Sequence, residues 1–276
     1  MISTLAYGLT IGGIFYIISI GLSLTFGTMR IVNFAHALVY TVGAYVLMAA
    51  LRARIGFLLA ALVGVAATIP LAWCIERYVI RRLYGQSIDY AIIATYAVLL
   101  IGVDATKWIF GATPMPLSDP IGRHVVLAGV SLPVYRLVII GVALAIFAGL
   151  ELFFRRTIVG KVVVAGLEDA EAARAIGLSV DRYFSLVFVV GSCLAALGGI
   201  LYAPITTLHP YMGFHVLLVC FAVVLVGGLG SMRGTFVAAF ALGLVMALTG
   251  RFWGPAAETM VFAVMAATLV FKPIEV

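Results

Sequence analysis

The polar residues with the most chemical potential lie together in an apolar stretch near the start of the chain. Arg30, Asn33 and His36 occur in the segment FGTMRIVNFAHALVYTVGAY, and Tyr40 follows them. A polar side chain inside a membrane needs a hydrogen-bonding partner or water, so such residues are candidates for a transport path. Asn33 and His36 would share one face of a helix because they are three residues apart. We interpret the four residues either as part of a translocation path or as packing contacts that bond each other and backbone carbonyls.

The remaining reactive side chains show no spacing that is typical of an active site or a metal site. The four histidines have no cysteine or carboxylate neighbours in a catalytic pattern. The three cysteines lie far apart in apolar stretches without a C-x-x-C motif, so we interpret them as small apolar side chains. The sequence therefore argues against a membrane-embedded enzyme and predicts no bound metal.

Two charged pairs have an ordinary structural interpretation. Asp104 and Lys107 are three residues apart near the end of an apolar run, with Trp108 beside them. This pattern favours an interfacial ion pair with an aromatic anchor over a proton relay. Glu151 precedes Arg155 by four residues, which is the spacing of an ion pair at a helix end.

The elements that must position these residues follow from the composition. The chain has 276 residues, of which 64% are hydrophobic and 10% are charged, whereas soluble domains average about 25% charged residues. These values exclude a soluble enzyme, a disordered tail and a secreted disulfide scaffold. The net charge of +6 comes from basic residues in short connections, so it indicates membrane orientation and not a nucleic-acid partner. The chain is predicted to lie in a lipid membrane.

Nine apolar segments are candidates for membrane spans, because a spanning helix needs about 20 apolar residues. They cover residues 2–28, 31–51, 55–75, 88–110, 135–154, 183–203, 214–230, 234–249 and 255–271. Segment 31–51 carries the polar cluster, and Gly227, Gly228 and Ser231 lie in a Gly-rich interruption further along. We expect both regions to be broken or re-entrant beside the transport path. The sequence predicts an all-α polytopic bundle, one domain over residues 1–276, with about eight crossings and one or two broken segments.

A tetrapeptide occurs twice in similar surroundings. Residues 27–30 read Gly-Thr-Met-Arg and residues 230–233 read Gly-Ser-Met-Arg, and each follows one apolar run and precedes another. Paired broken segments are typical of transporters built from repeats. Short matches also arise by chance in Gly-rich sequences, so an internal repeat and a chance match both stay open.

Short basic loops indicate the orientation. Loops 76–87 and 155–182 hold eight of the 17 Lys and Arg residues, and two spans separate them, so we expect both loops in the cytoplasm. The Pro-rich stretch 111–134 then lies outside, and its apolar part predicts a short hairpin or lid. We expect a cytoplasmic C-terminus, whereas the side of the N-terminus depends on whether the first polar segment crosses. Arg52 and Arg54 fall on the outer side in this scheme.

The second basic loop contains a candidate binding element for a partner protein. Its sequence GKVVVAGLEDAEAARAIGLSVDRYF predicts a short amphipathic helix within residues 167–176. Glu168 and Glu171 lie early and Arg174 lies late, which suits the helix dipole, and Gly177 suits the C-cap. An ordinary solvated loop helix is the alternative interpretation.

Three blocks of the sequence resemble one family of membrane permeases. Glu171-Ala172-Ala173 followed by Gly177 fits the E-A-A-x-x-x-G coupling loop of permeases in ATP-binding-cassette importers. The blocks GLSLTFGTMRIVNFAHALVYTVGAYV and VVLVGGLGSMRGTFVAAFALGL resemble the inner-membrane permeases of branched-chain amino acid uptake systems. The resemblance implies that an ATPase subunit is contacted by Glu168, Glu171, Ala172, Ala173, Arg174 and Gly177.

The resemblance also implies a set of partners. Such a permease pairs with a second, similar permease chain, which we expect to be different from this one. Two ATP-binding subunits, which hold ATP and Mg²⁺, lie on the cytoplasmic side, and a periplasmic binding protein delivers the solute to the bacterial inner membrane. Branched-chain amino acids, amides, urea and small carboxylates are all cargoes of relatives, so the family leaves the solute open.

Hydrolysis of ATP is expected on another chain. The phosphate-binding motif G-x-x-x-x-G-K-[ST] does not occur here, because Gly160-Lys161 is followed by Val162. The alternative function is a secondary transporter or channel that works alone. That function needs paired buried carboxylates or rings of like residues, and only Asp104 and Glu258 are candidates. We therefore predict a permease subunit that binds no cofactor itself.

Overall fold

The computed structural model of the chain describes residues 1–29, 31–127, 129–175 and 177–271. Among these residues, eight helices are long and apolar enough to cross a membrane. They are α1 (Ile2–Met29), α2 (Ala35–Arg52), α3 (Phe57–Tyr78), α4 (Ile88–Phe110), α5 (Val134–Arg156), α8 (Val180–Tyr202), α10 (Met232–Phe252), and α11 (Ala257–Phe271) with the preceding turn η2 (Gly254–Ala256). A shorter apolar helix, α9 (Met212–Gly227), lies among them. The prediction of an all-α polytopic bundle with about eight crossings is confirmed.

The connections contain short elements that the apolar pattern does not reveal. They are η1 (Ile80–Leu83), α6 (Ile158–Glu168), α7 (Ala170–Ala175), β1 (Met115–Pro116), β2 (His124–Leu127), β3 (Val130–Pro133) and β4 (Thr207–Leu208). Strands β2 and β3 form an antiparallel hairpin in which His124 pairs with Pro133. This confirms the hairpin expected within 111–134. Strand β1 pairs with β4, so this segment is also joined to the connection between α8 and α9.

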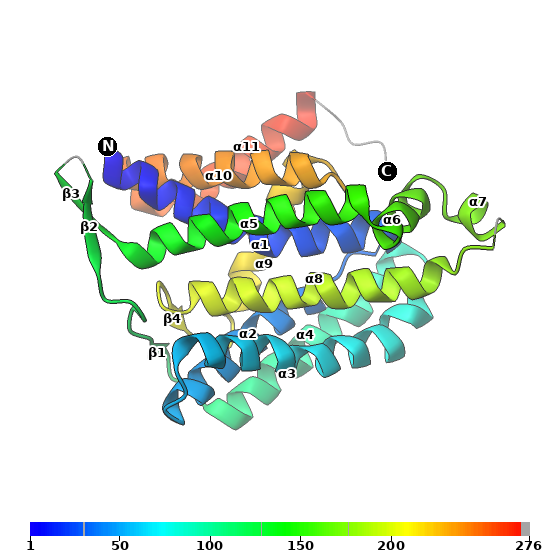
Figure 1. The fold of residues 1–276 in the computed structure, drawn as a ribbon, viewed down its shortest axis with the longest axis horizontal. Helices are drawn as coiled ribbons and strands as arrows, with labels where there is room; N and C mark the ends of the chain where they lie inside the picture. Colours follow the sequence, from blue (N-terminus) through cyan, green and yellow to red (C-terminus); the bar gives the residue numbers. More distant parts are fainter. Residues whose placement is uncertain (30, 128, 176, 272–276) are drawn as a thin grey trace.

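The long helices run between two ends of the bundle (Figure 1). We call the end with α6 and α7 the coupling end and the end with β2 and β3 the hairpin end. The two basic loops meet at the coupling end, where Arg77 and Arg182 line one cavity. The chain starts at the hairpin end, where Arg251 Nη1 donates to Thr4 Oγ1 at 3.3 Å. Arg52 also lies there, because its Nη2 contacts Met115 Sδ at 3.0 Å.

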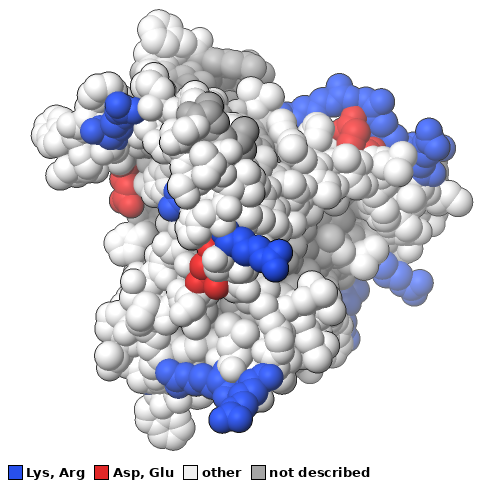
Figure 2. Space-filling model, turned by 60° about the vertical axis from the view of Figure 1, so that its left-hand side comes forward, with Lys and Arg blue, Asp and Glu red and all other residues white. Residues whose placement is uncertain are grey.

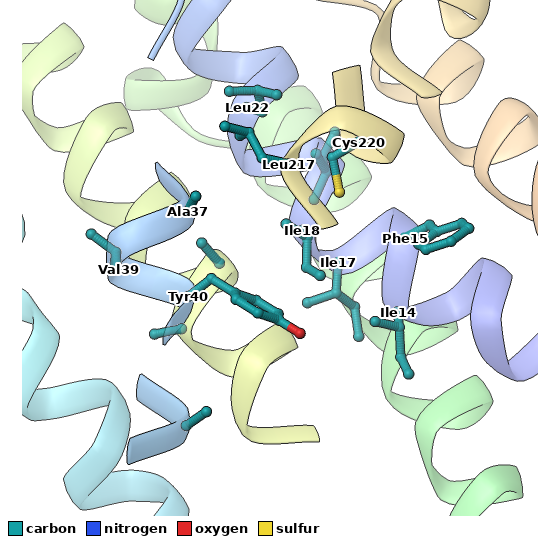
Figure 3. Close-up of a cluster of buried hydrophobic side chains, with 14 of the residues drawn as sticks. Ile14, Phe15, Ile17, Ile18, Leu22, Ala37, Val39, Tyr40, Leu217 and Cys220 are labelled. Atoms are coloured by element: carbon teal, nitrogen blue, oxygen red, sulfur yellow. The ribbon is translucent and has the colours of Figure 1, made fainter. Parts of the chain in front are cut away.

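Helix α1 forms the centre of the bundle and packs against α5, α8, α9 and α10. Its middle is buried without interruption, as Figure 3 shows for Ile14, Ile17 and Ile18 facing residues of α2 and α9. Small residues permit this density, because a Cβ at Gly21 would lie only 2.3 Å from the carbonyl oxygen of Gly191. Close backbone contact replaces the hydrophobic effect as the cause of helix association in lipid.

The outer helices expose large apolar side chains. Leu58 on α3 is 77% exposed and Ile101 on α4 is 71% exposed. Lysine, arginine and acidic side chains form small isolated groups on the face seen in Figure 2, and most of that face is uncharged. A surface of this kind suits hydrocarbon, in which apolar side chains need no burial within the protein.

Candidate functional site: two helix breaks and a loop helix

The first break separates α1 from α2. Helix α1 ends at Met29 and α2 begins at Ala35, and residues 31–33 are not helical. This irregular backbone is covered by protein, since Ile31 is 5% exposed and Asn33 is 1% exposed. The expectation of a broken segment is therefore correct for this region. Arg30, the first residue of the predicted cluster, lies outside the described residues.

The break corrects the predicted geometry of Asn33 and His36. Asn33 precedes α2 and His36 lies in its first turn, so the two residues do not share one face of a helix. They do not bond each other through their side chains, because His36 Nε2 instead contacts the carbonyl oxygen of Ile18 at 3.0 Å. His36 thus joins α2 to the middle of α1. The contact matches the packing interpretation for His36.

Asn33 and Tyr40 differ from His36 in having no hydrogen-bonding partner among the described residues. Both residues are 1% exposed, and the amide atoms of Asn33 and the hydroxyl of Tyr40 make no hydrogen bond within the described part of the chain. Figure 3 shows Tyr40 projecting from α2 toward α1. Leaving a buried polar group unsatisfied costs about 1–3 kcal/mol. Such groups are suited to bind water, solute or another chain, as the transport-path interpretation requires.

A threonine on α4 supports the first break. The backbone N–H of Phe34 donates to Thr95 Oγ1 at 3.1 Å, and this hydroxyl can donate to the carbonyl oxygens of Ala91 at 2.7 Å or Val32 at 3.2 Å. Thr95 is not among the predicted site residues, because a single threonine in an apolar helix carries no distinctive signal. Thr95 and Phe34 are 61 positions apart in the sequence, and only the fold brings them together.

The second break, between α9 and α10, is a tight turn. Gly228 and Gly230 have positive φ angles of 90° and 75°, which favour glycine. A Cβ at Gly234 would lie 1.7 Å from the carbonyl oxygen of Gly227, so the two helices meet through bare backbone. Ser231 caps α10 by accepting a hydrogen bond from the Gly234 N–H at 3.1 Å. The predicted path residues Gly227, Gly228 and Ser231 thus have structural roles in this turn.

One apolar cavity of about 360 Å³ joins the surroundings of both breaks. Val32 and Phe34 line it from the first break, and Leu225 and Leu229 line it from the second. The other lining residues are Leu22, Phe26, Ile88, Ile92, Phe221 and Val224. Asn33, Gly227, Gly228 and Ser231 do not line this cavity. The two broken segments are therefore neighbours in space.

The predicted ion pairs are present, each with an additional partner. Lys107 Nζ lies 2.5 Å from Asp104 Oδ1 and donates to the hydroxyl of Tyr211 at 2.9 Å, which joins α4 to the start of α9. Glu151 lies 2.7 Å from Arg155 and also pairs with Arg233 of α10. Arg233 is not predictable as a partner from the sequence, because a pair across 82 residues has no local spacing signal. Among the described residues, no three His, Cys, Asp or Glu side chains are placed to hold a metal.

The second basic loop, residues 155–182, contains two helices instead of one. Helix α6 ends within the predicted range, at Glu168, and α7 covers only Ala170–Ala175. The single helix predicted within 167–176 is therefore divided at Asp169, and Glu168 ends a helix instead of lying early in one. Asp169 starts α7 by accepting from the Ala172 N–H at 2.9 Å. Gly177 ends it with φ 88°, and the next N–H, of Leu178, donates to the carbonyl oxygen of Ala173 at 3.1 Å. The expected C-cap at Gly177 is confirmed.

The exposed and buried sides of α7 are partly described. Ala172 is exposed, whereas Ala173 is only 4% exposed. The side chains of Glu168, Glu171 and Arg174 lie outside the described part of the structure. Their assignment to an ATPase contact stays a prediction.

A small apolar cluster connects α7 with the first helix break. Ala173, Val180 and Phe184 form this cluster, and Leu178 and Met29 pack against it. Met29 is the last residue of α1, directly before the break. The hydroxyl of Tyr84 also contacts Met29 Sδ, at 3.6 Å. This cluster therefore links α7, which carries predicted ATPase-contact residues, with the end of α1 that precedes the first break.

Comparisons with known proteins agree with this arrangement. The family model described as "Branched-chain amino acid transport system / permease component" matches residues 4–271. The high-affinity branched-chain amino acid transport system permease protein LivH of Escherichia coli K12 is 27% identical, over 96% of this chain and 92% of that protein. The corresponding protein BraD of Pseudomonas aeruginosa is 28% identical, over 98% and 93%. A probable LivH of Methanocaldococcus jannaschii is 25% identical, over 93% and 86%.

A solved structure has a similar fold. PsaBC from Streptococcus pneumoniae, determined in complex with Fab, matches with a TM-score of 0.51 over 97% of this chain and 88% of that chain. The sequence identity is 16%, so the similarity concerns the fold alone.

Proposed function

The chain belongs to the family of permease components of branched-chain amino acid transport systems, and from this premise we propose that it forms half of the translocation path of an ATP-driven importer. Its solute is a branched-chain amino acid or a related small polar molecule, as the names of its relatives suggest. The other half of the path is a second, similar permease chain. Two ATP-binding subunits bind ATP and Mg²⁺, and a periplasmic binding protein delivers the solute.

The apolar cluster that contains Ala173 of α7, and against which Met29 of α1 packs, is the observation that carries this proposal. Movement of an ATPase subunit against α7 would displace Ala173, and Ala173 packs in one cluster with Met29 at the end of α1. The adjacent residues 31–34 form the break that holds the unpaired side chain of Asn33. ATP binding would then favour one of two packings of the bundle, and the short apolar cluster would transmit the change.

The orientation follows from charge. The coupling end contains the two loops with eight of the 17 basic residues, so we assign it to the cytoplasmic side of the bacterial inner membrane. Helix α11 runs toward that end and the chain starts at the other end (Figure 1), so this assignment would put the end of α11 in the cytoplasm and the start of α1 outside. Arg52 and Arg54 then lie outside as well. The hairpin end would receive the periplasmic binding protein.

The experiment compares two glycine variants in the complex isolated from native membranes. Gly177→Val forces a β-branched residue into φ 88° at the end of α7, and Gly85→Val introduces the same strain at φ 77° in the turn between η1 and α4. We expect Gly177→Val to lower ATP-driven leucine uptake in proteoliposomes about tenfold or more while the chain stays inserted. Gly85→Val should retain uptake, because this turn lies outside α7 and a Cβ at Gly85 meets no atom within 4 Å.

Two results would contradict the proposal. Equal uptake and equal recovery of the ATPase with both variants would remove the role of α7 in coupling. Leucine uptake by the purified single chain, without ATP or an ATPase, would instead support a secondary transporter or channel.

A further inference from the structure

A basic cavity of about 460 Å³ lies at the coupling end, between α3, η1 and the start of α8. The proposed transport mechanism does not use it. Three arginines line it, together with two aromatic residues and two hydrogen-bonding side chains. The lining consists of Arg77, Arg81, Arg182, Trp73, Tyr78, Glu76 and Ser185. Such a concentration of positive charge is unusual in a chain with only 10% charged residues.

The side chains described around the cavity do not neutralise its charge. Arg77, Arg81 and Arg182 are exposed, and no carboxylate whose side chain the structure describes forms an ion pair with them. Glu76 is only 2% exposed and accepts hydrogen bonds from Ser185 Oγ at 2.5 Å and Tyr84 at 3.5 Å. Its carboxylate is thus held as part of the wall. Three positive charges and one negative charge leave a formal excess of two, which suits a phosphate group.

The surroundings of the cavity are apolar on the side toward the middle of the bundle. On α3, Ile69 and Trp73 lie eight and four residues before Arg77 on the same helical stripe, and they are 45% and 51% exposed. On α8, Leu186 and Val190 follow Arg182 at the same spacing and are 46% and 40% exposed. Helices α3 and α8 pack against each other, so two exposed apolar stripes lead away from the arginines.

We propose that this cavity binds the phosphate of an anionic glycerophospholipid, whose acyl chains lie along the two stripes. A cationic pocket continuous with an apolar surface complements both parts of such a molecule. Exposed Trp73 and Tyr78, whose rings lie 6.3 Å apart, would sit at the level of the headgroup. The inference requires a membrane-spanning chain but no coupling role for α7, so it can fail or succeed independently of the proposed function.

The test uses tryptophan fluorescence in the full chain. A background with Trp108→Phe and Trp253→Phe leaves Trp73 as the single tryptophan. The protein is reconstituted into phosphatidylcholine vesicles that contain a small fraction of brominated phosphatidylglycerol, or brominated phosphatidylcholine as the neutral probe. We expect brominated phosphatidylglycerol to quench Trp73 several-fold more strongly than its neutral counterpart.

Paired substitutions locate the effect. Arg81→Gln with Arg182→Gln should weaken phosphatidylglycerol binding roughly tenfold or more, because each basic residue contributes to attraction of an anionic lipid. Arg52→Gln with Arg54→Gln removes the same charge at the hairpin end and should leave the quenching unchanged. If the double variant does not fold, Arg182→Lys takes its place. This substitution keeps the positive charge and tests the guanidinium geometry, and it should weaken phosphatidylglycerol binding by a smaller factor.

Other outcomes would overturn the lipid assignment. Equal quenching by both brominated lipids, or unchanged preference in the Arg81/Arg182 variant and in Arg182→Lys, would show that the arginines hold no lipid. Displacement of the anionic lipid by millimolar inorganic phosphate would assign the cavity to free phosphate. Loss of the ATPase from pull-downs of the double variant, with lipid preference retained, would assign it to a protein contact.

Discussion

Similar tetrapeptides adjoin the two helix breaks, one at the end of α1 and one at the start of α10, but the two breaks have opposite chemistry. After Gly27-Thr28-Met29, the chain becomes irregular and buries Asn33 without a hydrogen-bonding partner among the described residues. At Gly230-Ser231-Met232, the backbone turns tightly and Ser231 caps the next helix. A break that satisfies its own polar groups is a structural turn. A break that leaves a buried amide unpaired retains the capacity to bind something else.

The surrounding helices cause this difference. The second break closes on itself, because Gly227 and Gly234 bring α9 and α10 into backbone contact. The first break needs support from outside, and it receives that support from Thr95 of α4 and from Met29 in the α7 cluster. The first break can therefore respond to movement of its neighbours, whereas the backbone contact between α9 and α10 keeps the second break rigid.

The substitution with the largest expected effect on stability lies at the second break, between α9 and α10. Gly234→Val places a side chain where even a Cβ would lie 1.7 Å from the Gly227 carbonyl oxygen. We expect a loss of more than about 3 kcal/mol, which should prevent accumulation of folded protein in size-exclusion chromatography. Gly141→Val on α5 is the control, because a Cβ at Gly141 meets no atom within 4 Å. A normal yield of folded Gly234→Val protein would show that the backbone contact between α9 and α10 is not rigid.

A second substitution separates function from stability at the first break. Asn33→Leu removes a buried amide that has no partner in the described structure, so the melting temperature should stay constant or rise while uptake falls about tenfold. His36→Leu removes the contact with the Ile18 carbonyl oxygen and should lower the melting temperature. A lowered melting temperature for Asn33→Leu with normal uptake would make both residues packing contacts.

The smallest expected effect concerns the external support of the first break. Thr95→Val removes the acceptor of the Phe34 N–H with little change in shape and should cost about 1 kcal/mol, measured by thermal unfolding in detergent. Thr106→Val on the same helix removes only a hydroxyl that bonds its own helix, to Gly102, and should have a smaller effect. Equal losses for the two variants would argue that Thr95 does not support the break.

The apolar pattern predicted most of the fold because membrane helices satisfy their backbone internally and need only a run of apolar residues. The hairpin around Gly129 and the C-cap at Gly177 were also predictable, since positive φ angles favour glycine. The contacts of Arg233 with Glu151 and of Phe34 with Thr95 were not predictable. They join residues 82 and 61 positions apart, and periodicity carries no information about such pairs.

The sequence by itself determined that this chain is a membrane-spanning helical bundle with a short helix inside its second basic loop, because these features depend on local composition and spacing. The tertiary structure alone decided which polar residues lack partners and which part of the bundle α7 contacts. Asn33 and His36 are three residues apart, yet only His36 finds a carbonyl group, that of Ile18, within reach. Hydrogen-bond satisfaction depends on neighbours from other helices, and the fold is what brings those neighbours together.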